Sequence, residues 1–407
     1  MKKYILYLVL SLVLFAGCSD SVIGYESREA YVETLAESNV IYYTTSDGKM
    51  IKPTYSEVFA TKVVSNDYED GLGVMTFDRP INEIGANMFA GCVNLVSITL
   101  PYSVTKIGKG AFKNCTSLSS VGLAEVTSVI DDDAFCNCYA LTSFTIPQKV
   151  ERIGSRAFRG CLNLLEISIP DGVTYIGEEA FSHCRLIESM FIPDSVTEIG
   201  GAVFKECSAL TSVTLPNAIT VIQYQMFYNC ALLSGIVIPE GVSAVGTGAF
   251  QGCRSLKKVT LPDGMLSIGD DAFNNCAELT SINIPSELTE IGHRAFMSCE
   301  KLFFGEIILP EGVRRIGGYA FYGNTSITKI EIPEVTWYIG EYSFASCNNL
   351  LSVYCKPKEP AELYPYNAFA DNGPGRKIYV PSESLEKYKE RSYWRDFAED
   401  IVGYDFE

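Results

Sequence analysis

The sequence predicts a repeat solenoid, a stack of similar coils with a parallel β-sheet on one face and a different segment capping each end. The first observation is a pattern of three spaced apolar residues and a proline, as in Leu210-x-x-Val213-x-Leu215-Pro216. It recurs every 23 residues over most of the chain. The second is a phenylalanine that recurs at the same step. Its copies are Phe89, Phe112, Phe135, Phe158, Phe181, Phe204, Phe227, Phe250, Phe273 and Phe296, and the series continues at longer or equal steps with Phe321, Phe344 and Phe369.

Each unit is expected to contain two short extended segments. In the unit that contains Leu210, residues 213–215 alternate between apolar and polar side chains and are rich in β-branched residues, as is typical of a strand. Pro216 has no N–H to donate and ends this strand. A second extended segment follows in each unit, for example at residues 150–153. Because one unit cannot bury its apolar side chains alone, the units must stack and share a core.

A glycine follows the second extended segment in most units, as at Gly154. Because glycine adopts a positive φ without steric penalty, we interpret this position as a left-handed corner. Asp131 and Gln223 replace the glycine in two units. Since a glutamine side chain tolerates the left-handed region less well than aspartate does, the coil at Gln223 is expected to be the more strained.

Most of the 14 cysteines follow a repeat phenylalanine by three residues. Stacked copies would lie about 4.8 Å apart with parallel Cα–Cβ bonds, whereas a disulfide needs its Cβ atoms roughly 3.5–4.5 Å apart. We therefore expect free, buried thiols that pack as small hydrophobic side chains. The residues assigned to the structural ladder are Phe89, Phe112, Phe204, Cys92 and Cys207.

Few residues suit catalysis or metal binding. The only histidines, His183 and His293, occupy variable positions of the repeat, so surface roles are expected. Cys136 and Cys138 form a Cys-x-Cys pair, but no second pair lies at ligand spacing, so neither a metal site nor a cofactor is expected. No nucleophile elbow, phosphate-binding loop or metalloprotease motif is present, and the chain is not expected to be an enzyme.

The net charge limits the classes of molecule that the protein is expected to bind. The formal net charge is −17, from 49 acidic and 32 basic residues. Nucleic acids and anionic lipids bind clustered lysine and arginine, so no nucleic-acid partner is expected. The three consecutive aspartates at residues 131–133 are interpreted as a solvated turn in preference to a weak cation site.

The N-terminus has the character of a targeting segment. Lys2 and Lys3 precede an apolar run at residues 4–16 that is shorter than the roughly 20 residues a membrane-spanning helix needs. Residues 14–18, Leu-Phe-Ala-Gly-Cys, resemble a bacterial lipobox. The resemblance implies lipidation of Cys18 and attachment to the membrane through the lipid alone. The alternative is an ordinary secretory signal in which Cys18 is incidental.

The repeat unit Cys-x-x-Leu-x-x-Ile-x-Ile-Pro-x-x-Val-x-x-Ile-Gly-x-x-Ala-Phe resembles the BspA-like leucine-rich repeat over residues 81–354. The resemblance implies a right-handed, curved stack with a parallel sheet on one face. It also implies display on the cell surface and binding of host or matrix proteins. The asparagine ladder of commoner leucine-rich repeats is absent, and one unit is degenerate at residues 123–125.

The ends of the repeat array are expected to be atypical. A hairpin turning at Asp47-Gly48 is predicted to open the N-terminal cap, and residues 73–77 are predicted to be the first strand that joins the stack. Residues 377–381 are predicted to be the last strand, followed by a helix with Ser382 at its N-cap. The predicted domains are a signal peptide (1–17), a tether (18–38), an N-terminal cap (39–80), the solenoid (81–354) and a C-terminal capping strand and helix (355–407).

The outer face of the sheet is the candidate binding surface. Its outward column is mostly Thr and Ser, but Phe191, Val237 and Ile308 interrupt it with apolar side chains that are able to anchor a partner. The leading hypothesis is a lipoprotein of the outer membrane, exposed at the cell surface, that serves as a scaffold for binding host or matrix proteins. The alternative is a glycan-binding accessory protein of the outer membrane. The oligomeric state stays open.

Overall fold

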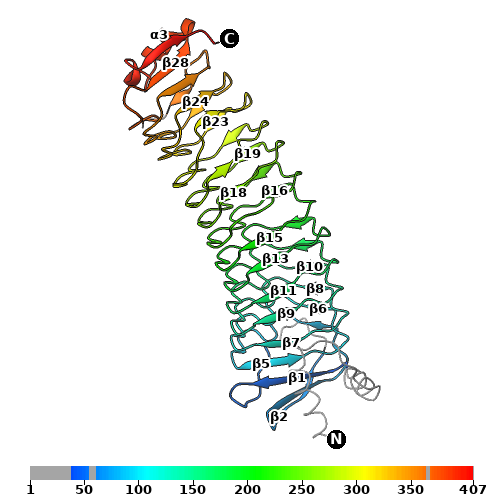
Figure 1. Ribbon diagram of the computed structural model, residues 1–407. Helices are drawn as coiled ribbons and strands as arrows, with labels where there is room; N and C mark the ends of the chain where they lie inside the picture. Colours follow the sequence, from blue (N-terminus) through cyan, green and yellow to red (C-terminus); the bar gives the residue numbers. More distant parts are fainter. Residues whose placement is uncertain (1–37, 55–60, 364–366, 407) are drawn as a thin grey trace, which may run out of the picture. The chain divides into compact units, whose positions relative to one another are not determined.

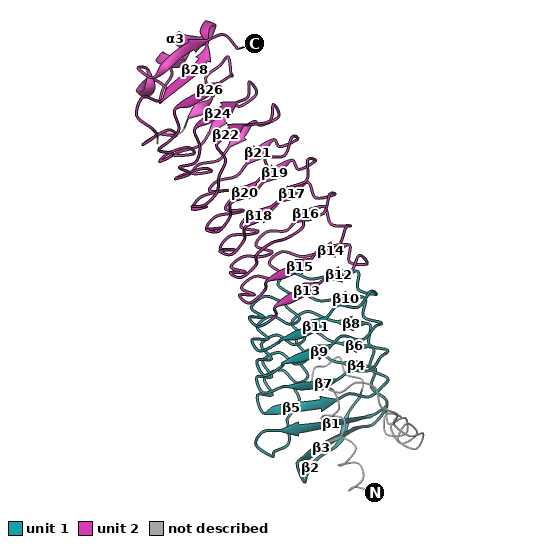
Figure 2. Ribbon diagram, in the orientation of Figure 1, with its two compact units in different colours: residues 1–186 teal, residues 187–407 magenta. Residues whose placement is uncertain are grey.

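The computed structural model describes residues 38–54, 61–363 and 367–406. The predicted signal peptide and Cys18 lie outside these residues, as does the predicted tether up to residue 37. The chain divides into two compact units, residues 1–186 and 187–407 (Figure 2), and each is described by itself. In the described part of the chain, no helix is long and apolar enough to cross a membrane.

Both units are solenoids of short parallel strands, as predicted (Figure 1). In unit 1, the first series of strands is β5 (Leu95–Thr99), β7 (Ser120–Gly122), β9 (Ser143–Thr145) and β11 (Glu166–Ser168). The second series is β4 (Glu83–Ile84), β6 (Lys106–Ile107), β8 (Val129–Ile130), β10 (Arg152–Ile153) and β12 (Tyr175–Ile176). Ile107 pairs with Ile130, and Ile130 pairs with Ile153. Equivalent residues of successive coils therefore lie directly over one another.

Unit 2 repeats this arrangement. Its first series is β13 (Ser189–Phe191), β15 (Ser212–Thr214), β18 (Lys258–Val259), β20 (Ser281–Ile282), β22 (Glu306–Ile308), β24 (Lys329–Ile332), β26 (Ser352–Cys355), β28 (Lys377–Pro381) and β29 (Ile401–Tyr404). Its second series is β14 (Glu198–Ile199), β16 (Val221–Ile222), β17 (Ala244–Val245), β19 (Ser267–Ile268), β21 (Glu290–Ile291), β23 (Arg315–Ile316), β25 (Tyr338–Ile339) and β27 (Glu362–Leu363). The pairing is again parallel between equivalent residues, as for Ser189 with Ser212.

The repeat phenylalanines form the centre of the core. Phe89 and Phe112 are fully buried and stack with ring centroids 5.4 Å apart and an interplanar angle of 11°. In unit 2, Phe204 is fully buried and stacks on Phe227 at 5.8 Å and 8°. Within the stack, each ring thus covers one face of each neighbouring ring, and its burial depends on the presence of the coils on either side.

The two additional residues near Leu302 change the core locally. Phe304, from the extended loop, packs edge-on against two ladder rings, with its centroid 5.8 Å from Phe296 and 5.6 Å from Phe321. Phe303, beside it, is 72% exposed. The longer step in the phenylalanine series therefore adds one aromatic side chain to the core and one to the surface.

The recurring glycine meets a steric demand that differs from the predicted one. Gly154 is not among the residues with positive φ, and neither are Asp131 and Gln223, so the prediction of a strained corner was wrong. A Cβ on Gly154 would lie 2.4 Å from the backbone carbon of Asp131 in the preceding coil. Real Cβ atoms do not approach that closely, so the glycine is required by the contact between two backbones.

Positive φ occurs instead two residues before and two residues after the repeat phenylalanine. Around Phe135 these residues are Asp133, with φ 56°, and Asn137, with φ 61°. Other coils use Gly, Asn, Asp, Arg, Glu, Gln, Ser, Tyr, Ala or His at the same two positions. The left-handed turns therefore flank the aromatic ladder on both sides.

The N-terminal cap differs from the prediction in its strand pairing. Residues 49–51 form no strand, so the predicted hairpin at Asp47-Gly48 was wrong. The hairpin joins β2 (Val63–Glu69) to β3 (Leu72–Phe77) and turns at Asp70 and Gly71, with φ 50° and 84°. Two successive residues with positive φ give a turn whose twist matches that of the strands.

A strand other than the predicted one joins the cap to the stack. β1 (Val40–Thr45) pairs antiparallel with both β3 and β5. The predicted first strand, residues 73–77, therefore belongs to β3 and reaches the solenoid only through β1. Ile41 and Tyr43 of β1 are 0% and 1% exposed, so this strand covers the apolar end of the first coil.

The predicted last strand of the C-terminal cap is followed by a further strand. β28 coincides with the predicted residues 377–381, but β29 follows it and pairs parallel to it. Between them lie η1 (Ser382–Ser384), α3 (Leu385–Glu390) and η2 (Arg395–Phe397). Ser384, not Ser382, occupies the N-cap of α3, and its hydroxyl donates to the carbonyl of Lys358 at 2.7 Å instead of capping the helix.

Candidate functional site

The predicted binding residues all lie in unit 2 and are strongly exposed. Phe191 on β13, Val237 and Ile308 on β22 are 62%, 83% and 61% exposed. They share one outward column but do not touch one another, because Thr214 separates the first two and further polar residues separate the last two. The structure therefore presents three separate apolar side chains along one face.

The same column continues into an aromatic cluster that sequence reasoning missed. Ile308 pairs with Glu331, Glu331 with Tyr354, and Tyr354 with Tyr379. The rings of Tyr354 and Tyr379 stack with centroids 4.6 Å apart. Tyr404 packs edge-on against them at 5.4 and 5.7 Å and is 43% exposed. The sequence feature that could have predicted this cluster is a tyrosine at the same outward position of two successive strands, Tyr354 in β26 and Tyr379 in β28.

Charged residues border this tyrosine cluster. Lys329 places its ammonium nitrogen 5.2 Å from the ring centroid of Tyr354 and 2.8 Å from Glu331. Lys356 lies 3.6 Å from the other carboxylate oxygen of Glu331. The hydrogen bond from Lys329 lowers the pKa of the Glu331 carboxyl against the opposing effect of burial. The cluster therefore combines an apolar centre with a charged edge.

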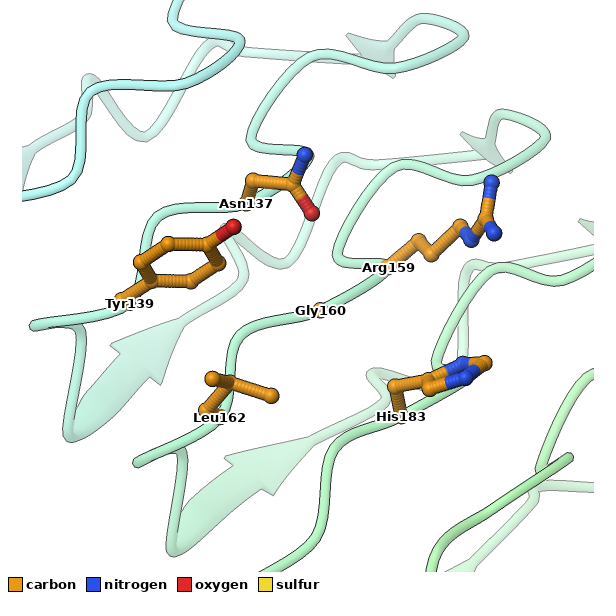
Figure 3. A pocket seen from close by; sticks show the side chains of 6 residues that line it. All are labelled: Asn137, Tyr139, Arg159, Gly160, Leu162 and His183. Atoms are coloured by element: carbon orange, nitrogen blue, oxygen red, sulfur yellow. The ribbon is translucent and has the colours of Figure 1, made fainter.

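Unit 1 contains a shallow pocket of about 260 Å³ at the edge of three successive coils. It is lined by Asn137, Tyr139, Arg159, Gly160, Leu162 and His183. Figure 3 shows the side chains arranged around Gly160, with Tyr139 and Leu162 on one side and Arg159 and His183 on the other. The pocket therefore has an apolar wall facing a basic wall.

The pocket exists because one coil lacks a side chain that its neighbours carry. Asn137, Gly160 and His183 occupy the same left-handed position in consecutive coils, with φ 61°, 73° and 63°. The Asn137 amide nitrogen donates to Asn114 in the preceding coil at 2.8 Å. At Gly160 this row of side chains is interrupted, and a hollow remains between Asn137 and His183. The sequence feature that could have predicted this pocket is a glycine at a repeat position that holds polar residues in the coils before and after it. Sequence reasoning missed it.

Two polar contacts shape the basic wall. The Arg159 guanidinium lies 3.6 Å from a carboxylate oxygen of Glu179, and its side chain is 41% exposed. The Nδ1 atom of His183 shares a hydrogen bond of 2.7 Å with the hydroxyl of Ser182. His183, expected to be a surface residue, is half-buried at the rim of the hollow. An exposed ion pair of this length contributes little to stability, so Arg159 is able to exchange its partner.

The cysteine ladder forms a series of hydrogen bonds. Cys207 is fully buried, and Cys92 at the start of the ladder is half-buried. The Cys115 thiol donates to the carbonyl of Phe89 at 3.0 Å, and equivalent bonds recur in both units. Burial raises the pKa of the Cys115 thiol to about 12. These thiols therefore stay protonated and are poor nucleophiles at neutral pH.

The acidic cluster at residues 131–133 is structural, and its interpretation as a solvated turn was wrong for Asp133. This carboxylate is 5% exposed and accepts two hydrogen bonds from Arg156, at 3.0 and 3.1 Å. Asp132 accepts the N–H of Ser155 at 2.8 Å. Among the described residues, no group of three or more His, Cys, Asp or Glu side chains is placed to hold a metal ion.

The stacked parallel strands and the buried aromatic ladder define a leucine-rich-repeat solenoid. Consistent with this class, the family model described as BspA type leucine rich repeat region (6 copies) matches over residues 68–187, 128–256, 176–303, 226–351 and 267–396. The matches together span more than half of the chain. The chain therefore belongs to the BspA type leucine-rich repeat family, which confirms the resemblance seen in the sequence. The family and its fold are repeat scaffolds and indicate no catalytic family.

Solved structures resemble the chain in fold. A leucine-rich repeat protein from Bacteroides ovatus is 23% identical, with a TM-score of 0.55 and coverage of 82% of this chain and 98% of that one. The pneumococcal vaccine antigen PcpA is 19% identical, with a TM-score of 0.53 and coverage of 80% and 84%. A leucine rich cell surface protein from Faecalibacterium prausnitzii is 26% identical, with a TM-score of 0.45 and coverage of 83% and 96%. Among curated proteins, none matches the chain.

Proposed function

We propose that this protein is a surface-displayed scaffold that binds other proteins through the outer sheet face of unit 2. The observation that carries this proposal is the outward column in which Phe191, Val237 and Ile308 are each more than 60% exposed. That column ends in the cluster of Tyr354, Tyr379 and Tyr404. Tyrosine is enriched among the residues that dominate protein-binding energy, and phenylalanine is enriched in protein interfaces.

The geometry of the tyrosine cluster favours a protein over a glycan. The rings of Tyr354 and Tyr379 face each other at an interplanar angle of 16°, and Tyr404 stands edge-on to both. A sugar ring stacks on a flat aromatic face, whereas these rings turn their faces toward one another. Their edges and hydroxyl groups suit the mixed apolar and polar contacts of a protein interface.

Display at the cell surface is proposed from the N-terminal segment and the family. The basic residues, apolar run and Cys18 resemble a lipoprotein signal, which would anchor the protein to the outer membrane by acyl chains. The BspA-like resemblance implies surface display and host or matrix proteins as partners. Protease treatment of intact cells tests this part: loss of the protein at the surface is expected, and complete resistance would contradict it.

Binding to a panel of purified matrix proteins tests whether the outer sheet face of unit 2 is the binding surface. The combined substitution Phe191→Ser, Val237→Ser and Ile308→Ser is expected to weaken binding about tenfold or more, because each anchor is removed without touching the core. A matched control replaces Leu165, Leu186 and Leu232, which are 52%, 41% and 51% exposed, with serine. Equal affinity of the two triple variants would exclude this face. Selective binding on a glycan array would instead favour the accessory-protein alternative.

A further inference from the structure

The pocket around Gly160 has the composition of a site for a carboxylate beside an apolar group. Arg159 presents a guanidinium, which pairs with a carboxylate through two parallel N–H donors. Leu162 and Tyr139 form the opposite wall, and Tyr139 is 39% exposed. The volume of about 260 Å³ is on the scale of one or two amino-acid side chains. Figure 3 shows Asn137 bordering the space over Gly160, with Leu162 and Arg159 on opposite sides of it.

The local charge supports an acidic ligand although the whole chain is acidic. Nearby, Lys113 and Arg156 both pair with the single carboxylate of Asp133, at 3.5 and 3.0 Å. Arg185 is exposed and occupies, in the next coil, the repeat position of Leu162. Arg159 and Arg185 therefore place two guanidinium groups in consecutive coils beside the hollow. These two groups are the ones that would attract a carboxylate to this edge of the unit.

The existing partner of Arg159 does not block such a ligand. Within the described residues, its ion pair is a single contact of 3.6 Å to Glu179, and both side chains are partly exposed. A bidentate carboxylate would replace this contact with shorter, charge-assisted hydrogen bonds. The Asn137 side-chain oxygen lies 2.5 Å from the point where a Cβ on residue 160 would stand, so any side chain here would meet it.

We propose that this hollow binds a glutamate or aspartate side chain of a partner protein, with an adjacent apolar residue of that partner lying on Leu162 and Tyr139. Arg159 holds the carboxylate, and His183 borders it from the next coil. The proposal rests on the proposed function in its choice of a protein partner. It adds a second contact in unit 1, chemically different from the apolar column of unit 2.

The two histidines offer a direct measurement. The chain contains only His183 and His293, so selective labelling of histidine gives two ring signals in an NMR spectrum, one at the pocket and one in unit 2. The probe is the blocked dipeptide acetyl-Glu-Leu-amide, titrated into the purified protein. We expect the His183 signal to shift to saturation while the His293 signal does not move. The glutamine counterpart, acetyl-Gln-Leu-amide, is expected to bind about tenfold or more weakly, because the charge-assisted bonds are lost.

Two variants and one control locate the site. Arg159→Gln removes the guanidinium, and Gly160→Asn restores the asparagine that precedes it in the row, at a φ that asparagine tolerates. Each is expected to abolish the saturable His183 shift. The matched control is Lys205→Gln, since Lys205 occupies the position of Arg159 in a coil whose next residue is Glu206 instead of glycine. The control is expected to bind as the parent protein does, and thermal unfolding shows whether each variant is folded.

The possible outcomes separate the proposals. Absence of a His183 shift, or equal binding of the two dipeptides, would overturn the carboxylate site. Tighter saturation by an oligosaccharide of glucuronic acid than by the glutamate dipeptide would overturn the choice of a protein partner. If the glutamate dipeptide does not bind but the triple serine substitution in the apolar column weakens partner binding, only the hollow is excluded as a binding site. If the glutamate dipeptide binds at the hollow but the triple serine substitution in the apolar column does not weaken partner binding, only the face of unit 2 is excluded.

Discussion

The thiol of Cys253 donates a hydrogen bond to the backbone carbonyl of Phe227, in the preceding coil, with a sulfur–oxygen distance of 3.1 Å. The same carbonyl also accepts the backbone N–H of Cys230 at 3.1 Å. The thiol thus supplies a second donor to a buried oxygen that has two lone pairs. A cysteine fits this position because it is small, apolar and still able to donate, a combination that alanine and valine lack.

The first prediction concerns thiol reactivity. Burial raises the pKa of the Cys115 thiol to about 12, whereas Cys92 is only half-buried. At about pH 8, iodoacetamide is expected to modify Cys92 of the native protein well before Cys115, because the thiolate is the reacting form. Peptide mapping by mass spectrometry measures the order. In denaturant the difference should disappear, and equal labelling of the two residues without denaturant would contradict the ladder.

The second prediction concerns the aromatic stack. Phe204→Ala is expected to lower the free energy of unfolding by about 3–5 kcal/mol, because it leaves a cavity beneath the ring of Phe227. Phe191→Ala makes the same chemical change at a side chain that is 62% exposed, and its effect is expected to stay within about 0.5 kcal/mol. Urea unfolding followed by circular dichroism measures both. Similar losses would mean that the two rings are not differently buried.

The third prediction concerns close approach between coils. Gly154→Ala places a methyl group 2.4 Å from the backbone of Asp131 and is expected to cost about 1–3 kcal/mol or more. Gly264→Ala meets nothing within 4 Å and is expected to be neutral or stabilising by up to about 1 kcal/mol. Melting temperatures compare the pair. Were both alanines tolerated alike, the backbone contact at Gly154 would not be the reason for the glycine.

The fourth prediction concerns acid stability. Burial acts to raise the pKa of the Asp133 carboxyl, but Arg156 and Lys113 together hold it below its ordinary value. A group whose pKa is lower in the folded state stabilises the protein above its unfolded pKa, and this contribution is lost as the pH falls through the folded value. Asp133→Asn is therefore expected to cost about 1–3 kcal/mol at neutral pH. The cost should shrink below about pH 4.

Unfolding by urea at neutral pH and at about pH 3 measures this change. The control is Asp171→Asn, which alters an exposed aspartate of a neighbouring coil. A cost for Asp133→Asn that does not depend on pH would show that the ion pairs with Arg156 and Lys113 are not its cause.

The repeating part of the fold was predictable because the sequence samples each position many times. Phe89 and its successors share one environment, so their spacing reports the stacking step directly. The role of Gly154 was not predictable in the same way. A positive φ and a close backbone contact both demand glycine, and only the coordinates distinguish the two demands.

The caps and the pocket resisted prediction for physical reasons. β1 pairs with β5, about 50 residues later in the chain, and no local pattern encodes that distant partner. The turn at Asp70-Gly71 did carry a signal that was overlooked beside the similar Asp47-Gly48. The hollow at Gly160 depends on side chains in three coils, so it arises from differences between repeats, whereas the fold was inferred from their likeness.

Bonds between coils in unit 2 join residues one repeat apart, as for Thr211 with Glu188 and Asn229 with Glu206. Removing one whole 23-residue period, such as residues 231–253, would leave each remaining donor opposite an equivalent acceptor. Duplication or loss of one 23-residue repeat is then expected to leave the fold of the other coils unchanged, provided that both caps are kept. A change in the number of coils would then change the number of outward positions available for new partners without a redesign of the interior.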